Sequence, residues 1–137
     1  MSLASEAVAV RRGPLVVAGG VVAAIMLASA ADTVIAQLAL AAGAPDDFQP
    51  LKAPSYIFLT TLGIVAGAIG WAILRKASKD PQALVRWLVP ALVLVSFVPD
   101  FLLYGDGGAT GVGALLLMHV TVATAAVVTY RKVMPLS

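Results

Sequence analysis

The sequence predicts an all-α fold: a four-transmembrane-helix bundle that forms a single membrane domain over residues 1–137. Three observations lead to this prediction. Hydrophobic residues make up 61% of the chain and charged residues only 12%, whereas soluble domains usually carry about 25% charged residues. Four apolar segments are each long enough to cross a bilayer. The basic residues gather in the connectors that would share one side of the membrane.

The four predicted spans have the length that a membrane requires. At 1.5 Å per residue, about 20 helical residues cross a hydrocarbon core of about 30 Å. Arg11 and Arg12, followed by an apolar run, resemble the start of a signal peptide, but the run is too long for a signal core. We therefore expect it to be retained as the first helix. The spans cover about residues 15–42, 55–74, 84–104 and 109–130.

The polar connectors predict the orientation. Of the nine Lys and Arg residues, only Lys52 falls on the side that also carries Asp46, Asp47 and Asp106. By the positive-inside rule, both termini are expected in the cytoplasm, in a multi-pass protein of the plasma membrane. The bias argues against a dual-topology protein. The other eight basic residues are Arg11, Arg12, Arg75, Lys76, Lys79, Arg86, Arg131 and Lys132.

Aromatic residues fall near the predicted membrane boundaries. Trp71, Trp87 and Tyr130 lie toward the inner side, and Tyr56 and Tyr104 lie toward the outer side. This placement is typical of interfacial aromatic belts. We therefore interpret these side chains as interface anchors, with ordinary packing inside the bundle as the alternative.

Two further segments bear on packing. Residues 44–54 form the longest external connector, which we interpret as a solvated turn, with a lid over the outer mouth as the alternative. In the second span, Gly63 and Gly67 form a GxxxG spacing that permits close helix contact. This spacing favours a contact within the chain over a dimer face. Gly105–Gly108 is expected to be an external turn.

Asp32 is the most informative residue, because it lies inside the otherwise uncharged first span. A carboxylate at mid-membrane costs about 2.5–3.5 kcal/mol by insertion scales, so it requires compensation and marks a candidate functional site. Gly20, Ala24, Ala28 and Asp32 recur every four residues and share one helix face. Small residues let helices approach closely in lipid. Asp32 is therefore expected on a packing face.

His119 is the expected partner of Asp32. Each lies about 10 residues, or roughly 15 Å, from the outer end of its span. Histidine exchanges protons near neutral pH, and an adjacent carboxyl group can orient it or be held neutral by desolvation. We interpret Asp32 and His119 as the catalytic pair, with a purely structural bond between two helices as the alternative.

Other polar side chains share the outer half of the membrane, whereas the inner halves are almost entirely apolar. This distribution predicts a polar pocket that faces outward. The residues expected to bind a substrate there are Asp100, Ser96, Thr60 and Gln37.

Several classes of function have no support in the sequence. Cysteine is absent, which excludes disulfides and thiolate chemistry. The net charge of +2 is too small to argue for nucleic acid. One His and two Asp would suffice for a facial metal triad, but no metal-ligand spacing is present, so we expect no metal and no cofactor. The expected partners are membrane lipids, a small lipophilic substrate and, through the glycine spacing, a second copy of the chain.

The sequence also resembles a known group of proteins. The stretch Leu116-Leu117-Met118-His119, together with Ser96 and Pro99 in the third span, is similar to small four-helix membrane proteins of actinobacteria with no assigned function. The resemblance implies no activity, but it implies that His119 and the Ser96–Asp100 turn belong to a family pattern. The chain also resembles small multidrug transporters in its four short helices and its acid in the first helix. It departs from them in its charge bias, second acid and histidine.

These observations lead to a functional hypothesis. We expect the protein to bind a small lipophilic molecule and to convert it by acid–base chemistry, such as an isomerisation, a cyclisation or an epoxide opening. Two alternatives remain open at this point. One is a transporter or proton-coupled carrier, and the other is a non-catalytic subunit or assembly partner of a membrane complex.

Overall fold

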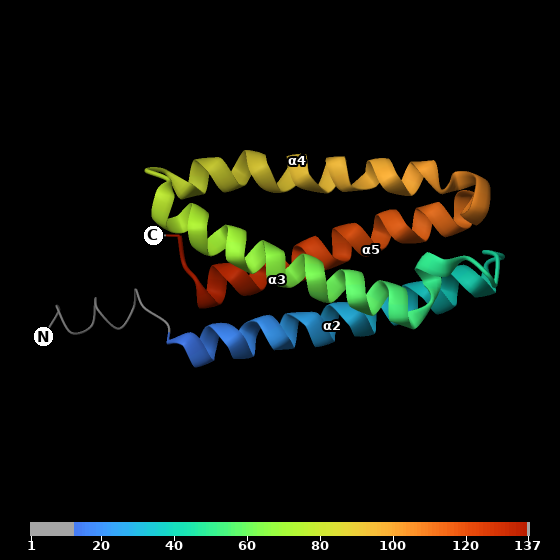
Figure 1. Cartoon of the computed structure of the whole chain (residues 1–137), viewed down its shortest axis with the longest axis horizontal. Helices are drawn as coiled ribbons and strands as arrows, with labels where there is room; N and C mark the ends of the chain where they lie inside the picture. Colours follow the sequence, from blue (N-terminus) through green and yellow to red (C-terminus); the bar gives the residue numbers. More distant parts are fainter. Residues whose placement is uncertain (1–12, 137) are drawn as a thin grey trace, which may run out of the picture.

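The computed structural model describes residues 13–136, and within them the chain forms four long helices that run alternately up and down (Figure 1). Each is long and apolar enough to cross a membrane, so the chain is a multi-pass membrane protein by the length and composition of its helices. Arg11 and Arg12, used above for orientation, lie outside the described residues. The helices are α2 (Pro14–Ala41), α3 (Ala53–Ala77), α4 (Pro81–Leu102) and α5 (Tyr104–Val133), with a 3₁₀ turn, η1 (Gln49–Leu51), before α3.

The helix ends follow from local chemistry. Proline in the first turn begins α2, α3 and α4, because the first helical residue needs no backbone donor. Asp80 also caps α4, where its carboxylate accepts a hydrogen bond of 3.1 Å from the backbone nitrogen of Ala83. After α2, the chain turns at Gly43 with a φ of 108°, a conformation that favours glycine.

The first part of α5 is a separate turn. Gly108 has φ 66° and ψ −175°, so a kink separates the turn over Tyr104–Gly107 from the long helix that follows. The expected turn at Gly105–Gly108 is therefore a helical turn that ends in a glycine kink. The four spans themselves match the predicted segments closely.

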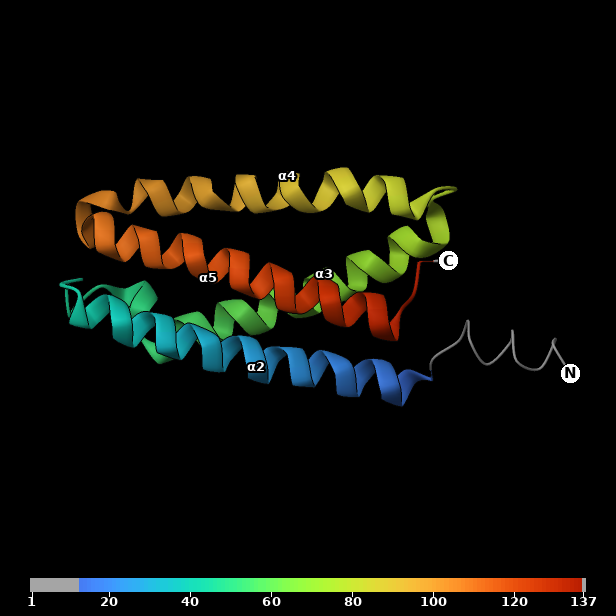
Figure 2. The ribbon, with the colours of Figure 1, turned by 180° about the vertical axis from the view of Figure 1, so that it is seen from behind.

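The helices pack unequally. Helix α2 packs extensively on α5 and α3, whereas α4 packs extensively only on α5. Accordingly, α4 and α2 lie on opposite sides of the molecule with α3 and α5 between them (Figures 1 and 2). The predicted small-residue face of α2 is confirmed, because Ala24, Ala28 and Asp32 are buried. Gly20 completes this face, since an added Cβ would lie 2.7 Å from Val133 on α5.

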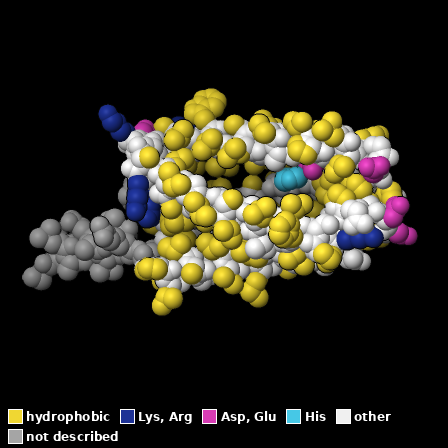
Figure 3. Space-filling model, viewed as in Figure 1, with side chains coloured by type: hydrophobic (Ala, Val, Ile, Leu, Met, Phe, Trp, Pro, Cys, Tyr) yellow, Lys and Arg dark blue, Asp and Glu magenta, His cyan; other side chains and the backbone are white. Residues whose placement is uncertain are grey.

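The two ends of the bundle carry opposite charge (Figure 3). We call them the basic end, with Arg75, Lys76, Lys79, Arg86, Arg131 and Lys132, and the acidic end, with Asp46, Asp47 and Asp106. Lys52 also lies at the acidic end, and Asp80 at the basic end. Between the ends, large apolar side chains such as Leu38 and Leu94 are exposed, as expected of a surface that meets lipid.

The connector at the acidic end is packed, so its interpretation as a solvated turn is wrong. Phe48 is only 3% exposed, and Ala44 and Leu51 are also buried. The ring of Phe48 lies directly on Gly107, where an added Cβ would come within 2.5 Å of it. The connector is thus held against α5 by an aromatic side chain that fits only beside glycine.

Candidate functional site

A cleft of about 520 Å³ lies between α3, α4 and α5, and we call it the α3–α4 cleft. It opens on the side of the bundle and not at an end, because α3 and α4 do not pack extensively on each other. Figure 3 shows the hollow, with the single histidine at its edge. Its walls are almost entirely apolar. They include Gly63 and Gly70 from α3, Leu88 and Leu92 from α4, and Val122 and Ala126 from α5.

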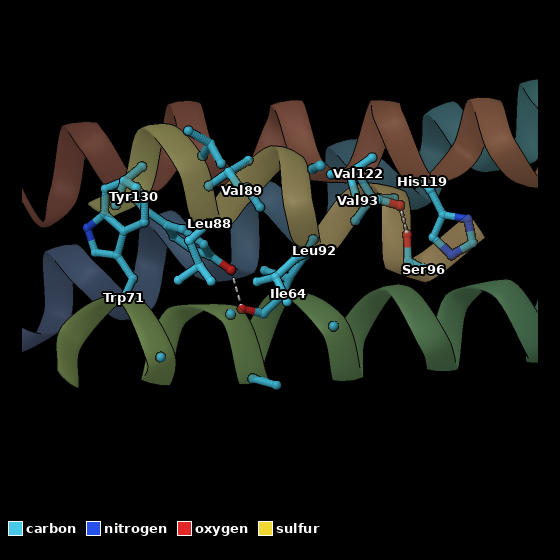
Figure 4. A pocket seen from close by; sticks show the side chains of 18 of the residues that line it. Ile64, Trp71, Leu88, Val89, Leu92, Val93, Ser96, His119, Val122 and Tyr130 are labelled. Atoms are coloured by element: carbon cyan, nitrogen blue, oxygen red, sulfur yellow. Dashed lines mark hydrogen bonds between the residues drawn. The ribbon is translucent and has the colours of Figure 1, made fainter. Parts of the chain in front are cut away.

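His119 and Ser96 form the polar end of this cleft (Figure 4). Nδ1 of His119 lies 2.7 Å from Oδ2 of Asp100, whose side chain is only 8% exposed, whereas the His119 side chain is 38% exposed. Phe97 meets the imidazole edge-on at 6.1 Å between ring centres. Because Asp100 and Phe97 hold one side of the ring, Nε2 is the nitrogen left for a ligand in the cleft.

The contact between Asp100 and His119 joins two antiparallel helices, and the direction of their side chains shortens the gap between the two groups. Every Cα–Cβ bond tilts toward the N-terminus of its helix. Asp100 on α4 therefore leans toward the basic end, and His119 on the antiparallel α5 leans toward the acidic end. Their side chains meet although Asp100 lies close to the end of α4 and His119 lies far along α5.

Asp32 lies elsewhere, and its hydrogen-bond partner is Thr60. Thr60 on α3 donates a hydrogen bond of 2.6 Å from Oγ1 to Oδ2 of Asp32, which is fully buried. A hydrogen bond between Asp32 and His119 does not occur in the described part of the chain. A catalytic role for Asp32 stays a prediction.

The remaining predicted site residues are dispersed. Ser96 lines the cleft, but its hydroxyl donates to the carbonyl oxygen of Val93 over 2.6 Å. Thr60 is occupied by Asp32, and Gln37 is exposed on α2, away from the cleft. Two of the six predicted residues, His119 and Ser96, line the α3–α4 cleft, whose walls are mostly apolar. Asp100 joins them through its contact with His119.

Sequence reasoning missed the residues that close the other end of the cleft. Trp71 donates from its indole nitrogen to the carbonyl oxygen of Met134 over 2.9 Å, and the Tyr130 hydroxyl donates to the carbonyl oxygen of Ile64. The two rings lie 5.4 Å apart between centres. Trp71, Tyr130 and also Tyr56 are buried, so these three are packing residues and not interface anchors. Trp87 and Tyr104 are exposed, as anchors should be.

One comparison with known proteins gives a result. Residues 4–135 match the model of a family of unknown function (DUF6069). The chain belongs to the DUF6069 family. The match confirms that the resemblance is to proteins with no assigned function. No curated protein and no solved structure matches the DUF6069 chain. Within residues 13–136 of this DUF6069 protein, no group of three or more His, Asp or Glu side chains is placed to hold a metal ion.

The buried Asp32–Thr60 hydrogen bond gives a first prediction for the DUF6069 chain. Asp32→Asn retains an acceptor for Thr60 and is expected to change the free energy of unfolding by less than about 1 kcal/mol. Asp32→Ala leaves the Thr60 hydroxyl without that acceptor and is expected to cost about 1–3 kcal/mol. The measurement is unfolding by SDS in mixed micelles.

Gln37→Ala is the matched control, because Gln37 lies on the same helix but is exposed. It should leave stability unchanged. If Asp32→Asn were as damaging as Asp32→Ala, the negative charge of Asp32, and not its acceptor oxygen, would be required.

Proposed function

We propose that the protein binds a small lipophilic molecule in the α3–α4 cleft and converts it by acid–base chemistry at His119. The observation that carries this proposal is the placement of the Asp100–His119 contact at the polar end of an otherwise apolar cleft. Such a cleft, with a few convergent polar groups, is the usual form of a small-molecule site. Its side opening lets a molecule enter from the lipid phase.

His119 is the group that would exchange the proton, and Asp100 would be its positioning residue. A carboxylate beside Nδ1 fixes the tautomer of a neutral imidazole, so that Nε2 carries the lone pair that accepts a proton. The same carboxylate stabilises the imidazolium that forms, and Nε2 then donates the proton at another atom of the substrate. An isomerisation, a cyclisation and an epoxide opening each need a proton to be delivered, removed or moved in this way.

The proposed reaction predicts a graded loss of activity. General acid–base catalysis contributes roughly 10²–10⁴-fold, so His119→Gln should slow conversion by about that factor. Asp100→Asn should slow it less, because the imidazole remains. The measurement compares lipid extracts, by mass spectrometry, from cells that carry the wild-type protein or a variant and from cells that lack it.

Thr121→Val is the matched control. Thr121 lies on α5 near His119, but its hydroxyl bonds within its own helix, to the carbonyl oxygen of Leu117 at 2.8 Å, and it does not line the cleft. Its extract should match that of the wild type. If His119→Gln, present at wild-type levels, gave the wild-type extract as well, the proposal would be wrong.

The charge distribution supports an orientation for this site. Six of the seven described Lys and Arg residues lie at the basic end, and such residues favour the cytoplasmic side. We therefore propose that the basic end is cytoplasmic in the plasma membrane. The α3–α4 cleft would then occupy the cytoplasmic half of the bilayer, with His119 near the midplane.

A further inference from the structure

The α3–α4 cleft offers hydrogen-bonding groups at one end only. No Asp, Glu, Lys or Arg is among the described residues that line it. At the basic end, Trp71 and Tyr130 both donate to backbone carbonyls, as described above. At the other end, Nε2 of His119 is not engaged by Asp100, and the His119 side chain is 38% exposed, whereas Trp71 and Tyr130 are buried. A ligand is therefore offered hydrogen bonds at the end nearest the middle of the bundle.

The basic end of the cleft is closed. Trp71, Val85 and Tyr130 are 5%, 3% and 4% exposed, and Met134, which follows α5, packs against them at 4% exposed. A lipid lying in the cleft could not extend a headgroup past this cluster to reach the water at the basic end. The part of the molecule that lies inside the cleft must instead fit between this cluster and His119.

The length of this space limits the ligand to one chain. Tyr130 and His119 are eleven residues apart on α5, which corresponds to about 16 Å at 1.5 Å per residue. The volume of about 520 Å³ is that of a site for one small molecule. A charged headgroup would have to lie beside the imidazole, deep in the hydrocarbon, where a charge without a partner is costly. Asp100 would in addition repel an anion there.

From these features we infer that the ligand is an uncharged, single-chain lipophile with one hydrogen-bonding oxygen at its end, such as a ketone, an alcohol or an epoxide. It enters between α3 and α4, places its oxygen at His119 and extends its chain toward Trp71. This inference rests on the proposed function for the location of the site. It adds the chemical class of the substrate, and it excludes phospholipids.

The single histidine allows a direct test by nuclear magnetic resonance. In the full-length protein labelled with ¹⁵N-histidine and reconstituted in nanodiscs, every side-chain signal comes from His119. Titration with 2-dodecanone, at a pH at which the ¹⁵N signals show the imidazolium of His119, should shift the Nε2 signal until it saturates, because the ketone oxygen accepts a hydrogen bond from Nε2–H of that form. Dodecane and dodecyl phosphate should produce no saturable shift. A saturable shift with dodecyl phosphate, or none with 2-dodecanone, would overturn the inference.

Two glycines allow the cleft to be filled without disturbing the fold. Gly63 and Gly70 line the cleft, and an added Cβ would meet no atom within 4 Å at either position. Gly63→Leu and Gly70→Leu should each weaken the response to 2-dodecanone at least tenfold. Gly19→Leu is the control, because Gly19 has equal space but lies on α2, outside the cleft. Equal responses from all three variants would place the ketone elsewhere and overturn the inference.

The two proposals fail separately. If His119→Gln abolishes conversion but 2-dodecanone does not bind, the class of ligand is wrong and the proposed function stands. If 2-dodecanone binds and Gly63→Leu blocks it, but His119→Gln leaves the lipid extract unchanged, the class of ligand is supported and the proposed chemistry is wrong.

Discussion

Replacing Phe48 with alanine is expected to lower the free energy of unfolding by about 3–5 kcal/mol, the usual cost of removing a buried aromatic ring. The ring is 3% exposed and lies on Gly107 and Gly111 of α5. An added Cβ at Gly111 would lie 3.0 Å from the ring, so the site is shaped for this side chain. Nothing else in the connector has the volume to fill the space. Unfolding by SDS in mixed micelles measures the loss.

Phe58→Ala is the matched control for this loss. Phe58 lies on α3 and is 65% exposed, so its ring meets lipid or detergent in the folded protein and its removal should cost little. Gly107→Val should destabilise the protein in the same way as Phe48→Ala, because the new side chain would displace the ring. Equal losses from Phe48→Ala and Phe58→Ala would show that the connector is not packed on α5.

Trp71→Ala is expected to cost a similar amount, about 3–5 kcal/mol, and to weaken ligand binding as well. The indole is buried, bonds the carbonyl oxygen of Met134 and lies 5.8 Å beneath the Arg131 guanidinium. Its loss removes the contact that holds the chain after α5 against α3. It also opens the basic end of the α3–α4 cleft, so a bound lipophile should dissociate faster.

Two variants separate these effects of Trp71. Trp71→Phe keeps an aromatic ring at the closed end of the cleft, so it should retain ligand binding. It loses the hydrogen bond to Met134, which should lower the free energy of unfolding by roughly 0.5–1.5 kcal/mol, and the smaller ring should lower it further. Trp87→Ala is the exposed control, since Trp87 is 78% exposed. Unfolding by SDS in micelles measures the loss of stability, and the ¹⁵N signal of His119 measures ligand binding. If Trp71→Ala left both unchanged, Trp71 would not close the cleft.

The helices and their packing faces could be predicted from the sequence, because lipid imposes strong rules on composition and length. The face of α2 that contains Ala24, Ala28 and Asp32 was predicted from its spacing and is confirmed. The partners of the polar residues could not be predicted in this way. Counting residues from the membrane surface matched Asp32 to His119. Counting gives the depth of a side chain but not the helix face on which it lies: Asp32 on α2 faces Thr60 on α3, whereas Asp100 on α4 meets His119 on α5.

The cleft was not predictable for a different reason. Helix positions that line an apolar cavity and positions that face lipid carry the same types of amino acid, so the sequence does not distinguish them. Gly63 illustrates this, since its GxxxG spacing with Gly67 suggested a tight helix contact. Only Gly67 has one, because an added Cβ there would lie 2.7 Å from the Tyr130 hydroxyl oxygen. Whether a small residue permits contact or leaves space depends on the neighbouring helix, which the local sequence does not specify.

The isolation of α4 has a consequence for biosynthesis. Membrane helices are made in chain order, and α4 has extensive contacts only with α5, which follows it. When α4 has been synthesised, α2 and α3 can already associate, but α4 has no helix on which to pack extensively. It therefore remains surrounded by lipid until α5 is inserted between it and the rest of the bundle (Figure 2). The α3–α4 cleft therefore forms only when the last helix has been added.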